Sequence, residues 1–197
     1  MKTFTAKTFN IAKLKGISDE NVVEHLKLYA GYIKNANVIL QKIEELSADS
    51  EKNAYELAEV QRRFGFEYDG IRNHENYFEV LSNGAQEISK DGELCKAIEA
   101  TWGSYEKWLA RFKTIAMSRG IGWAILYFDK KENFLMNAYV GDHELGQLSG
   151  CVPLLCLDLW EHAYISDYKP GGKKDYVDDF FINLNWSVVE KNFTEAQ

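Results

Sequence analysis

The sequence predicts an α+β fold, with an N-terminal helical hairpin half and a C-terminal α/β half that contains a three-stranded antiparallel sheet. Apolar residues recur at helical spacing through the first half of the 197-residue chain. Apolar segments of strand length, rich in aromatic and β-branched residues, begin only after Arg119. This change predicts two domains, residues 1–83 and 84–197, that meet at Asn83-Gly84.

Four helices are expected before the sheet, over residues 19–46, 50–81, 85–100 and 104–119. Ser18 is a suitable N-cap for the first helix, and the acidic Asp19 and Glu20 suit the positive end of a helix. In the second helix, Gly65 and Gly70 are points where the helix could break, because glycine is a poor helix former.

Three strands are expected next. Residues 120–128 and 134–140 predict a hairpin joined by the polar stretch 129–133, and residues 153–157 predict a third strand that ends at Asp158. A final helix, in one or two pieces, is expected over residues 174–195.

The composition excludes several classes of protein. A net charge of −7 argues against binding to nucleic acid through a basic face. No apolar run approaches the roughly 20 residues of a membrane helix, and the N-terminus lacks the apolar core of a secretory signal. We interpret Cys95, Cys151 and Cys156 as reduced thiols, with a Cys151–Cys156 bond as the less favoured alternative, and we expect a cytoplasmic protein.

The four histidines are the most informative residues. Asp158 and His162 stand four residues apart at the end of a predicted strand, where a carboxylate oxygen and an imidazole nitrogen can converge on one Fe, Mn or Zn ion. Taken alone, this pair is better explained by an ordinary Asp–His hydrogen bond. His25 and His74 lie on two predicted helices. If both helices pack against the end of the sheet, the four residues form a site of three histidines and one aspartate.

Six segments carry a resemblance to a known family that covers nearly the whole chain. They are Asp158-x-Trp160-Glu161-His162-Ala163-Tyr164, His25 with Tyr32-Ile-Lys-Asn-Ala-Asn37, Asn73-His74 with Tyr77-Phe78, Trp102-Gly-Ser-Tyr-Glu106, Gly120-Ile-Gly-Trp123 and Asn185-Trp186. In type and order these segments resemble the iron/manganese superoxide dismutase family.

The resemblance implies that His25, His74, Asp158 and His162 bind one metal ion per subunit, with a solvent molecule as the fifth ligand. It also implies dismutation of superoxide to O₂ and H₂O₂, with the ion alternating between M(III) and M(II). The charge of Asp158 would stabilise the oxidised ion, and neutral imidazoles would leave the reduced ion accessible. The ligands suit iron and manganese equally, and we prefer iron.

A solvent-anchoring residue is also implied. Most of the family uses a glutamine, for which this chain has His143, with Asp142 as the alternative. The other family position for that glutamine is Gly70, which has no side chain to offer. Gly70 resembles the manganese type, whereas His143 resembles iron or metal-flexible members.

Two tyrosines depart from the family pattern. Tyr32 matches the tyrosine that guards access and relays protons, but it follows His25 by seven residues instead of the usual eight. Tyr29 stands where most members have a histidine that bonds a tyrosine of the other subunit, and that tyrosine is Ile165 here. Both ends of one bond are missing, so the relay would be simpler or rerouted through Tyr29.

The remaining matches concern the surroundings of the metal. Trp123 and Trp160 match aromatic residues that wall the pocket. Glu161 matches a residue that bonds a metal-binding histidine of the other subunit, which implies a homodimer, with a tetramer as the alternative. Lys173 and Lys174 follow where the family has a funnel arginine, and either would attract anionic superoxide, although a solvated lysine turn fits equally well.

Two other classes of function stay open at this point. A two-His-one-carboxylate iron oxygenase uses similar residues, but it needs an open coordination position, and a fourth protein ligand argues against it. A non-catalytic helical interaction protein would use its histidines structurally, and a metal content well below one ion per subunit would favour it.

Overall fold

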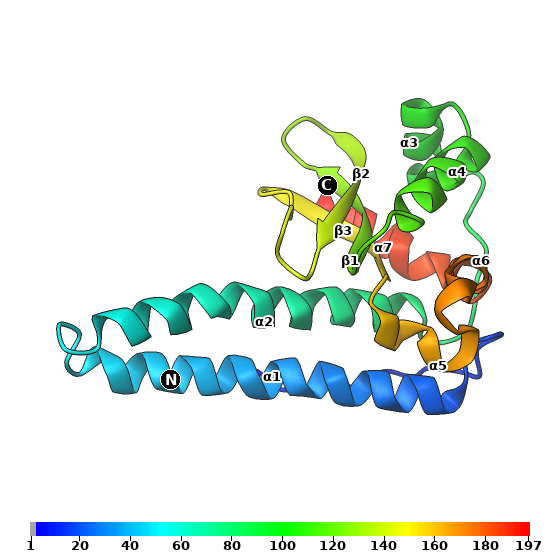
Figure 1. Ribbon diagram of the computed structural model, residues 1–197. Coiled ribbons are helices and arrows are strands. Elements are labelled where there is room, and N and C mark those ends of the chain that lie inside the picture. Colours follow the sequence, from blue (N-terminus) through cyan, green and yellow to red (C-terminus); the bar gives the residue numbers. More distant parts are fainter. Residues whose placement is uncertain (1–2) are drawn as a thin grey trace.

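A computed structural model describes residues 3–197 and confirms the α+β architecture (Figure 1). Two long antiparallel helices form the N-terminal hairpin: α1 (Asp19–Ser47) and α2 (Ala54–Val80). The next elements are α3 (Glu93–Trp102), α4 (Tyr105–Ala116), β1 (Gly122–Asp129), β2 (Phe134–Gly141) and β3 (Cys151–Asp158). The chain ends with η1 (Glu161–Ala163), α5 (Ile165–Tyr168), η2 (Pro170–Gly172), α6 (Lys173–Ile182) and α7 (Trp186–Ala196).

The helical hairpin follows its sequence signals closely. Ser18 caps α1, because its hydroxyl oxygen accepts a hydrogen bond from the backbone N–H of Asn21 at 3.1 Å. The suggested break in α2 is wrong, since the helix runs unbroken through Gly65 and Gly70. A glycine costs a helix only about 1 kcal/mol, and the packing of α2 against α1 and β3 outweighs that cost.

The sheet has the strand order β2-β1-β3, and both pairings are antiparallel. The central strand, β1, is buried along nearly its whole length. Helix α4 packs on β1 and β2, while α2 and α7 pack on β3. The register pairs Trp123 of β1 with Asp158, the last residue of β3. Both residues therefore reach the end of the sheet, where β3 meets α2.

The segment 85–92 is not helical, although a helix was expected to begin at residue 85. Gln86 pairs instead with the chain between α6 and α7: its N–H donates to the carbonyl of Leu184 and its carbonyl accepts from the N–H of Trp186, both at 3.1 Å. This long-range pairing uses the backbone groups that a helix would need. The final helix is divided at the same place, into α6 and α7.

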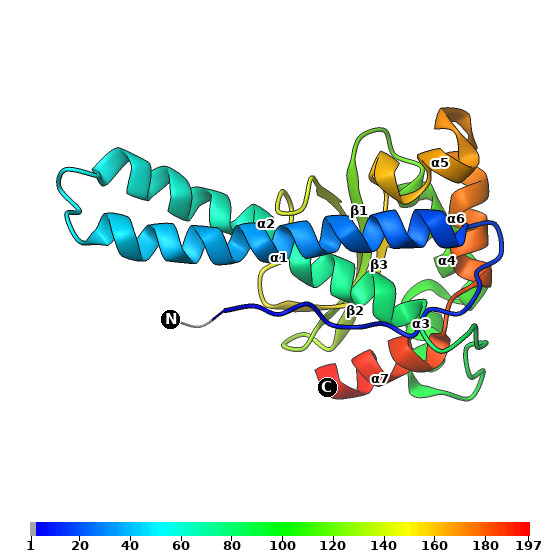
Figure 2. The same cartoon turned by 90° about the horizontal axis from the view of Figure 1, so that it is seen from below.

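Several smaller features bear on the expectations. The N-terminal segment runs in extended form along the hairpin (Figure 2), and the carbonyl of Asn10 accepts from the N–H of Asn83 at 2.8 Å. Asn83 and Gly84 form a turn with positive φ, 64° and 83°, but the division into two domains there stays a prediction. The three cysteines are free thiols. Within residues 3–197, no helix combines the length and apolar character that spanning a membrane requires.

Candidate metal centre

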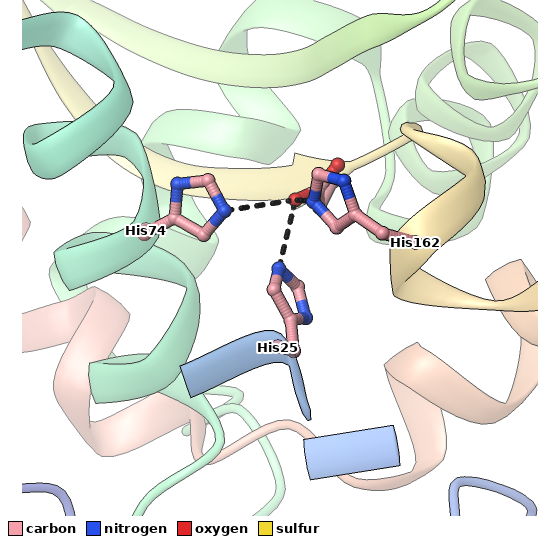
Figure 3. Close-up of side chains that lie close together, drawn as sticks. His25, His74 and His162 are labelled. Carbon is pink, nitrogen blue, oxygen red and sulfur yellow. Dashed lines mark hydrogen bonds and ion pairs between the residues drawn. The ribbon is translucent and has the colours of Figure 1, made fainter. Parts of the chain in front are cut away.

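The structure brings His25, His74, Asp158 and His162 together from four different elements. They lie on α1, on α2, at the end of β3 and in η1, respectively. The three histidines point toward one carboxylate (Figure 3). The Nε2 atoms of His25, His162 and His74 are 3.1, 3.2 and 3.5 Å from Oδ2 of Asp158. One ligand atom from each of the four residues lies within 4.8 Å of the others.

The environment of His74 determines which of its nitrogens carries a proton. Its Nδ1 is 2.6 Å from the carbonyl oxygen of Gly70, and a carbonyl can only accept, so Nδ1 carries the hydrogen and donates it. Burial lowers the pKa of His74 well below its ordinary value, so the ring is neutral. The Nε2 atom is consequently an unprotonated acceptor.

This acceptor faces another acceptor. His74 Nε2 is fully buried and has no hydrogen-bond partner among the described residues, and Oδ2 of Asp158 lies 3.5 Å away. Two lone pairs directed at one another in a dry interior are unfavourable unless a cation lies between them. Three imidazole nitrogens and one carboxylate oxygen are a donor set that suits Fe, Mn or Zn. The residues therefore fit a bound metal ion.

Asp158 is held as a carboxylate. Burial opposes its ionisation, but the neighbouring His162 and His25 outweigh burial and hold its pKa below the usual value. Its Oδ1 accepts from the backbone N–H of Trp160 at 2.8 Å, and its main-chain carbonyl accepts from the Tyr176 hydroxyl at 2.9 Å. The first contact orients the carboxylate and the second anchors the backbone of Asp158, and neither involves the histidines. Sequence reasoning missed Tyr176, because it reaches the site from α6.

A second chain of hydrogen bonds runs through His143. The indole Nε1 of Trp123 donates to His143 Nδ1 at 3.0 Å, and His143 Nε2 is 2.7 Å from the Tyr32 hydroxyl. An indole N–H can only donate, so Nδ1 is the accepting nitrogen and the hydrogen of the neutral ring is on Nε2. Burial lowers the pKa of His143 to about 4 and raises that of Tyr32. His143 is fully buried, whereas the backbone carbonyl of its neighbour Asp142 accepts from Trp160 Nε1 at 3.1 Å.

The seven-residue spacing between His25 and Tyr32 fits this geometry. Helix α1 is regular throughout, and seven residues turn an α-helix through about 700°, within roughly 20° of two full turns. Tyr32 therefore lies on the same face as His25. Gly70 provides the room, since a Cβ atom built there would lie only 2.8 Å from Cδ1 of Tyr32.

Tyr29 points elsewhere. Its hydroxyl donates to Oε1 of the buried Glu75 at 3.2 Å and accepts from the backbone N–H of Lys7 at 3.0 Å. Glu75 also pairs with the side chains of Lys7 and Arg72 at 3.3 and 2.7 Å. The Tyr29 hydroxyl thus belongs to a charged network beside His74. The proposed rerouting of a relay through Tyr29 stays a prediction.

Aromatic and amide side chains complete the surroundings. The Trp160 ring stacks on the rings of His143 and His162, at centroid distances of 4.8 and 5.7 Å. Phe66 of α2, which sequence reasoning missed, lies 4.6 Å from the His143 ring. The His143 carbonyl accepts from Asn73 at 3.3 Å and from Gln147 at 3.0 Å. In the sequence, the position of Asn73 next to His74 and the four-residue spacing of His143 and Gln147 are the signals that could have pointed to these two amides.

The charged residues expected near the site lie farther out. Glu161 is exposed beside the half-buried His162. Lys173 lines a hollow of about 260 Å³ together with Glu161 and Tyr164, and its Nζ donates to the carbonyl of Ser118 at 2.9 Å. Lys174 is exposed and pairs with Asp178 at 2.9 Å.

Comparison with known proteins agrees with this geometry. Residues 90–192, more than half of the chain, match the family described as iron/manganese superoxide dismutases, C-terminal domain. The superoxide dismutase [Mn] of Mycobacterium lepraemurium is 35% identical over 177 residues, which cover 89% of this chain and 84% of the relative. The superoxide dismutase [Fe] of Mycobacterium tuberculosis (strain H37Rv) is 36% identical over 178 residues, with the same coverage.

The fold and the cluster define a protein that can hold one metal ion between a helical hairpin and a small sheet. With the matches above, the chain belongs to the iron/manganese superoxide dismutase family.

The site predicts a metal content that depends on His74. We expect about one Fe or Mn ion per wild-type chain and far less in His74→Ala, because the substitution removes one of four converging ligand atoms. Inductively coupled plasma mass spectrometry measures this, and circular dichroism checks the fold. The matched control is His143→Gln, which leaves the four ligand atoms in place. A full complement of metal in His74→Ala would contradict the site.

Proposed function

We propose that the protein converts two superoxide anions and two protons into O₂ and H₂O₂, using one Fe or Mn ion held by His25, His74, Asp158 and His162. The observation that carries this proposal is the pair of facing acceptors, His74 Nε2 and Asp158 Oδ2. When bound, the ion supplies one-electron chemistry, accepting an electron from one superoxide and returning it to the next. Family membership supports the same reaction.

The ligand residues would balance the two half-reactions. Asp158 brings a negative charge that favours the oxidised ion, and the neutral imidazoles add none, so the reduced ion stays accessible. Burial lowers the pKa of His25 and of His74, so both rings stay uncharged and each keeps a nitrogen lone pair for the metal ion.

Tyr32 and His143 would deliver protons. Trp123 fixes His143 as the tautomer with hydrogen on Nε2, and this hydrogen is donated to the Tyr32 oxygen. The proton of the Tyr32 hydroxyl is then directed away from His143 and free to be donated to an anion in the pocket. The rings of Trp160 and Phe66 would exclude bulk water around this chain.

Iron is our proposed metal. The relatives carry both names, iron and manganese, at nearly equal identity, so similarity alone does not decide. Gly70 resembles the manganese type, but the close approach of Tyr32 accounts for a glycine there whichever metal is bound. His143 in place of a glutamine is therefore the more informative residue, and it favours iron.

We also propose that the protein works as a homodimer in the cytoplasm. Glu161 and Ile165 are exposed beside His162, whose side chain retains 19% of its exposure. A second copy packed on this face by a two-fold axis would cover His162 and bring Glu161 to it. The free cysteines support a reducing compartment, and cell fractionation that recovered the protein elsewhere would contradict that location.

Metal exchange tests the reaction. We expect protein reconstituted with iron to remove superoxide rapidly in stopped-flow measurements, and faster than the manganese form. Zinc is the matched control, because it accepts the same ligands without redox chemistry, and zinc-loaded protein should be inactive. Equal rates with iron and manganese would contradict the iron preference. Inactivity with both metals would contradict the proposed function.

Sedimentation tests the assembly. We expect twice the chain mass of 22.7 kDa for the wild type and dissociation of Glu161→Arg to monomers. The arginine cannot accept a hydrogen bond from the imidazole that Glu161 would meet across the two-fold axis, and it places a positive charge beside that ring. Glu93→Arg on α3 makes the same charge change at an exposed residue away from that face. A monomeric wild type at micromolar concentration would contradict the homodimer.

Charge reversal tests the lysines. We expect Lys173→Glu/Lys174→Glu to lower the second-order rate with superoxide at low ionic strength and to have little effect at high ionic strength, because salt screens long-range attraction. Lys96→Glu/Lys107→Glu on α3 and α4 gives the same net charge and serves as the control. A rate equal to that of the control would remove Lys173 and Lys174 from substrate attraction.

A further inference from the structure

Arg63 lies on α2, one turn before Phe66, and stacks on that ring. The guanidinium carbon is 3.6 Å from the centroid of Phe66. The centroid of the same Phe66 ring is 4.6 Å from that of His143 and 6.2 Å from that of Tyr32. A single aromatic side chain therefore separates the Arg63 charge from the hydrogen-bond chain of the site.

The ion pair that Arg63 forms has a defined direction. Its Nε donates to Oε1 of Glu67 at 3.1 Å. The Arg63 side chain is 49% exposed, whereas the Glu67 side chain is only 5% exposed. The pair thus presents its positive end to solvent and keeps its negative end inside. The charge that this pair exposes to solvent is therefore positive, although the protein as a whole is net negative.

The outer edge of the guanidinium is available. Among the described residues, Arg63 uses only Nε for hydrogen bonding within the protein, so both terminal Nη groups retain their hydrogens for another acceptor. Its neighbour Arg62 differs, because both Nε and Nη2 of Arg62 donate to Glu59. A guanidinium edge with free N–H groups is a good binding group for a small oxyanion.

The field of Arg63 reaches the site. Burial raises the pKa of Tyr32, and the Arg63 charge opposes that rise. Burial also lowers the pKa of His143, and the same charge lowers it further. A nearby positive charge lowers the pKa of a tyrosine and of a histidine alike, and Arg63 has this effect on both residues.

We propose that Arg63 is a docking group for the anionic substrate, holding superoxide at its Nη edge on the outer side of Phe66 before the anion reaches Tyr32. The proposal rests on the proposed function. It differs from the lysine prediction in location and in kind, since Arg63 is on α2 and offers direct hydrogen bonds rather than distant attraction alone.

Two readouts test Arg63 on iron-loaded protein. One is the second-order rate with superoxide as a function of ionic strength. The other is the dissociation constant of azide, a small anion, from the visible absorption of the bound iron. We expect Arg63→Gln to lower the rate and weaken azide binding by roughly two- to fivefold at low ionic strength. Both effects should become small at about 0.5 M salt, because salt anions then compete for the Nη edge and the Debye length is only about 4 Å.

The partner residue gives a test of opposite sign. Glu67→Gln removes the counter-charge and should raise the rate and tighten azide binding at low ionic strength. If the substitutions acted only by disturbing the packing of the protein, both Arg63→Gln and Glu67→Gln would lower the rate and weaken azide binding. Arg63→Gln/Glu67→Gln preserves the wild-type net charge and avoids an unpaired buried Glu67, yet it should retain the loss. Arg62→Gln is the matched control and should behave as the wild type.

Either of two results would overturn the proposal: wild-type rate and azide affinity in Arg63→Gln at low salt, or a loss that persists unchanged at high salt. Because azide binding does not depend on turnover, the two hypotheses can fail separately. An Arg63-dependent azide affinity in a protein without dismutase activity would support docking while contradicting the proposed function.

Discussion

The arrangement of the molecule depends on one unfavourable contact, the two buried acceptors His74 Nε2 and Asp158 Oδ2 that face each other at 3.5 Å. Without a cation, a buried carboxylate oxygen and the lone pair of a neutral imidazole would be directed at one another in a dry interior, which is unfavourable. The contact connects two different elements, since α2 carries His74 and the end of β3 carries Asp158. A bound ion would therefore join the helical hairpin to the sheet.

Gly70 links this contact to the hydrogen-bond chain beside it. Its carbonyl accepts from His74 Nδ1 and so exposes the lone pair on Nε2. Its missing side chain admits the ring of Tyr32, whose hydroxyl lies against His143. One small residue thus fixes the tautomer of His74 and gives room to Tyr32, the proton donor that we propose. A side chain there would disturb the second role while leaving the first intact, because the carbonyl belongs to the backbone.

Local patterns predicted those parts of the structure that local forces determine. Helical periodicity and the Ser18 cap located α1, and the apolar runs located the three strands. The segment 85–92 was mistaken for helix because its backbone pairs with residues a hundred positions away. The four clustered residues were identified by their pattern and by resemblance, whereas Phe66 and Tyr176 reach the site through packing that no spacing in the sequence encodes.

The acidic composition presents a problem that the fold resolves locally. A net charge of −7 repels an anionic substrate at long range, but salt reduces the Debye length to about 8 Å under physiological conditions, so the charges closest to the entrance dominate. In the ion pair that we propose for docking, the Glu67 side chain is buried and the Arg63 side chain is half-exposed. The pair is neutral in sum and positive toward solvent. An acidic protein can in this way receive an anion, because the direction of its ion pairs matters more than their number.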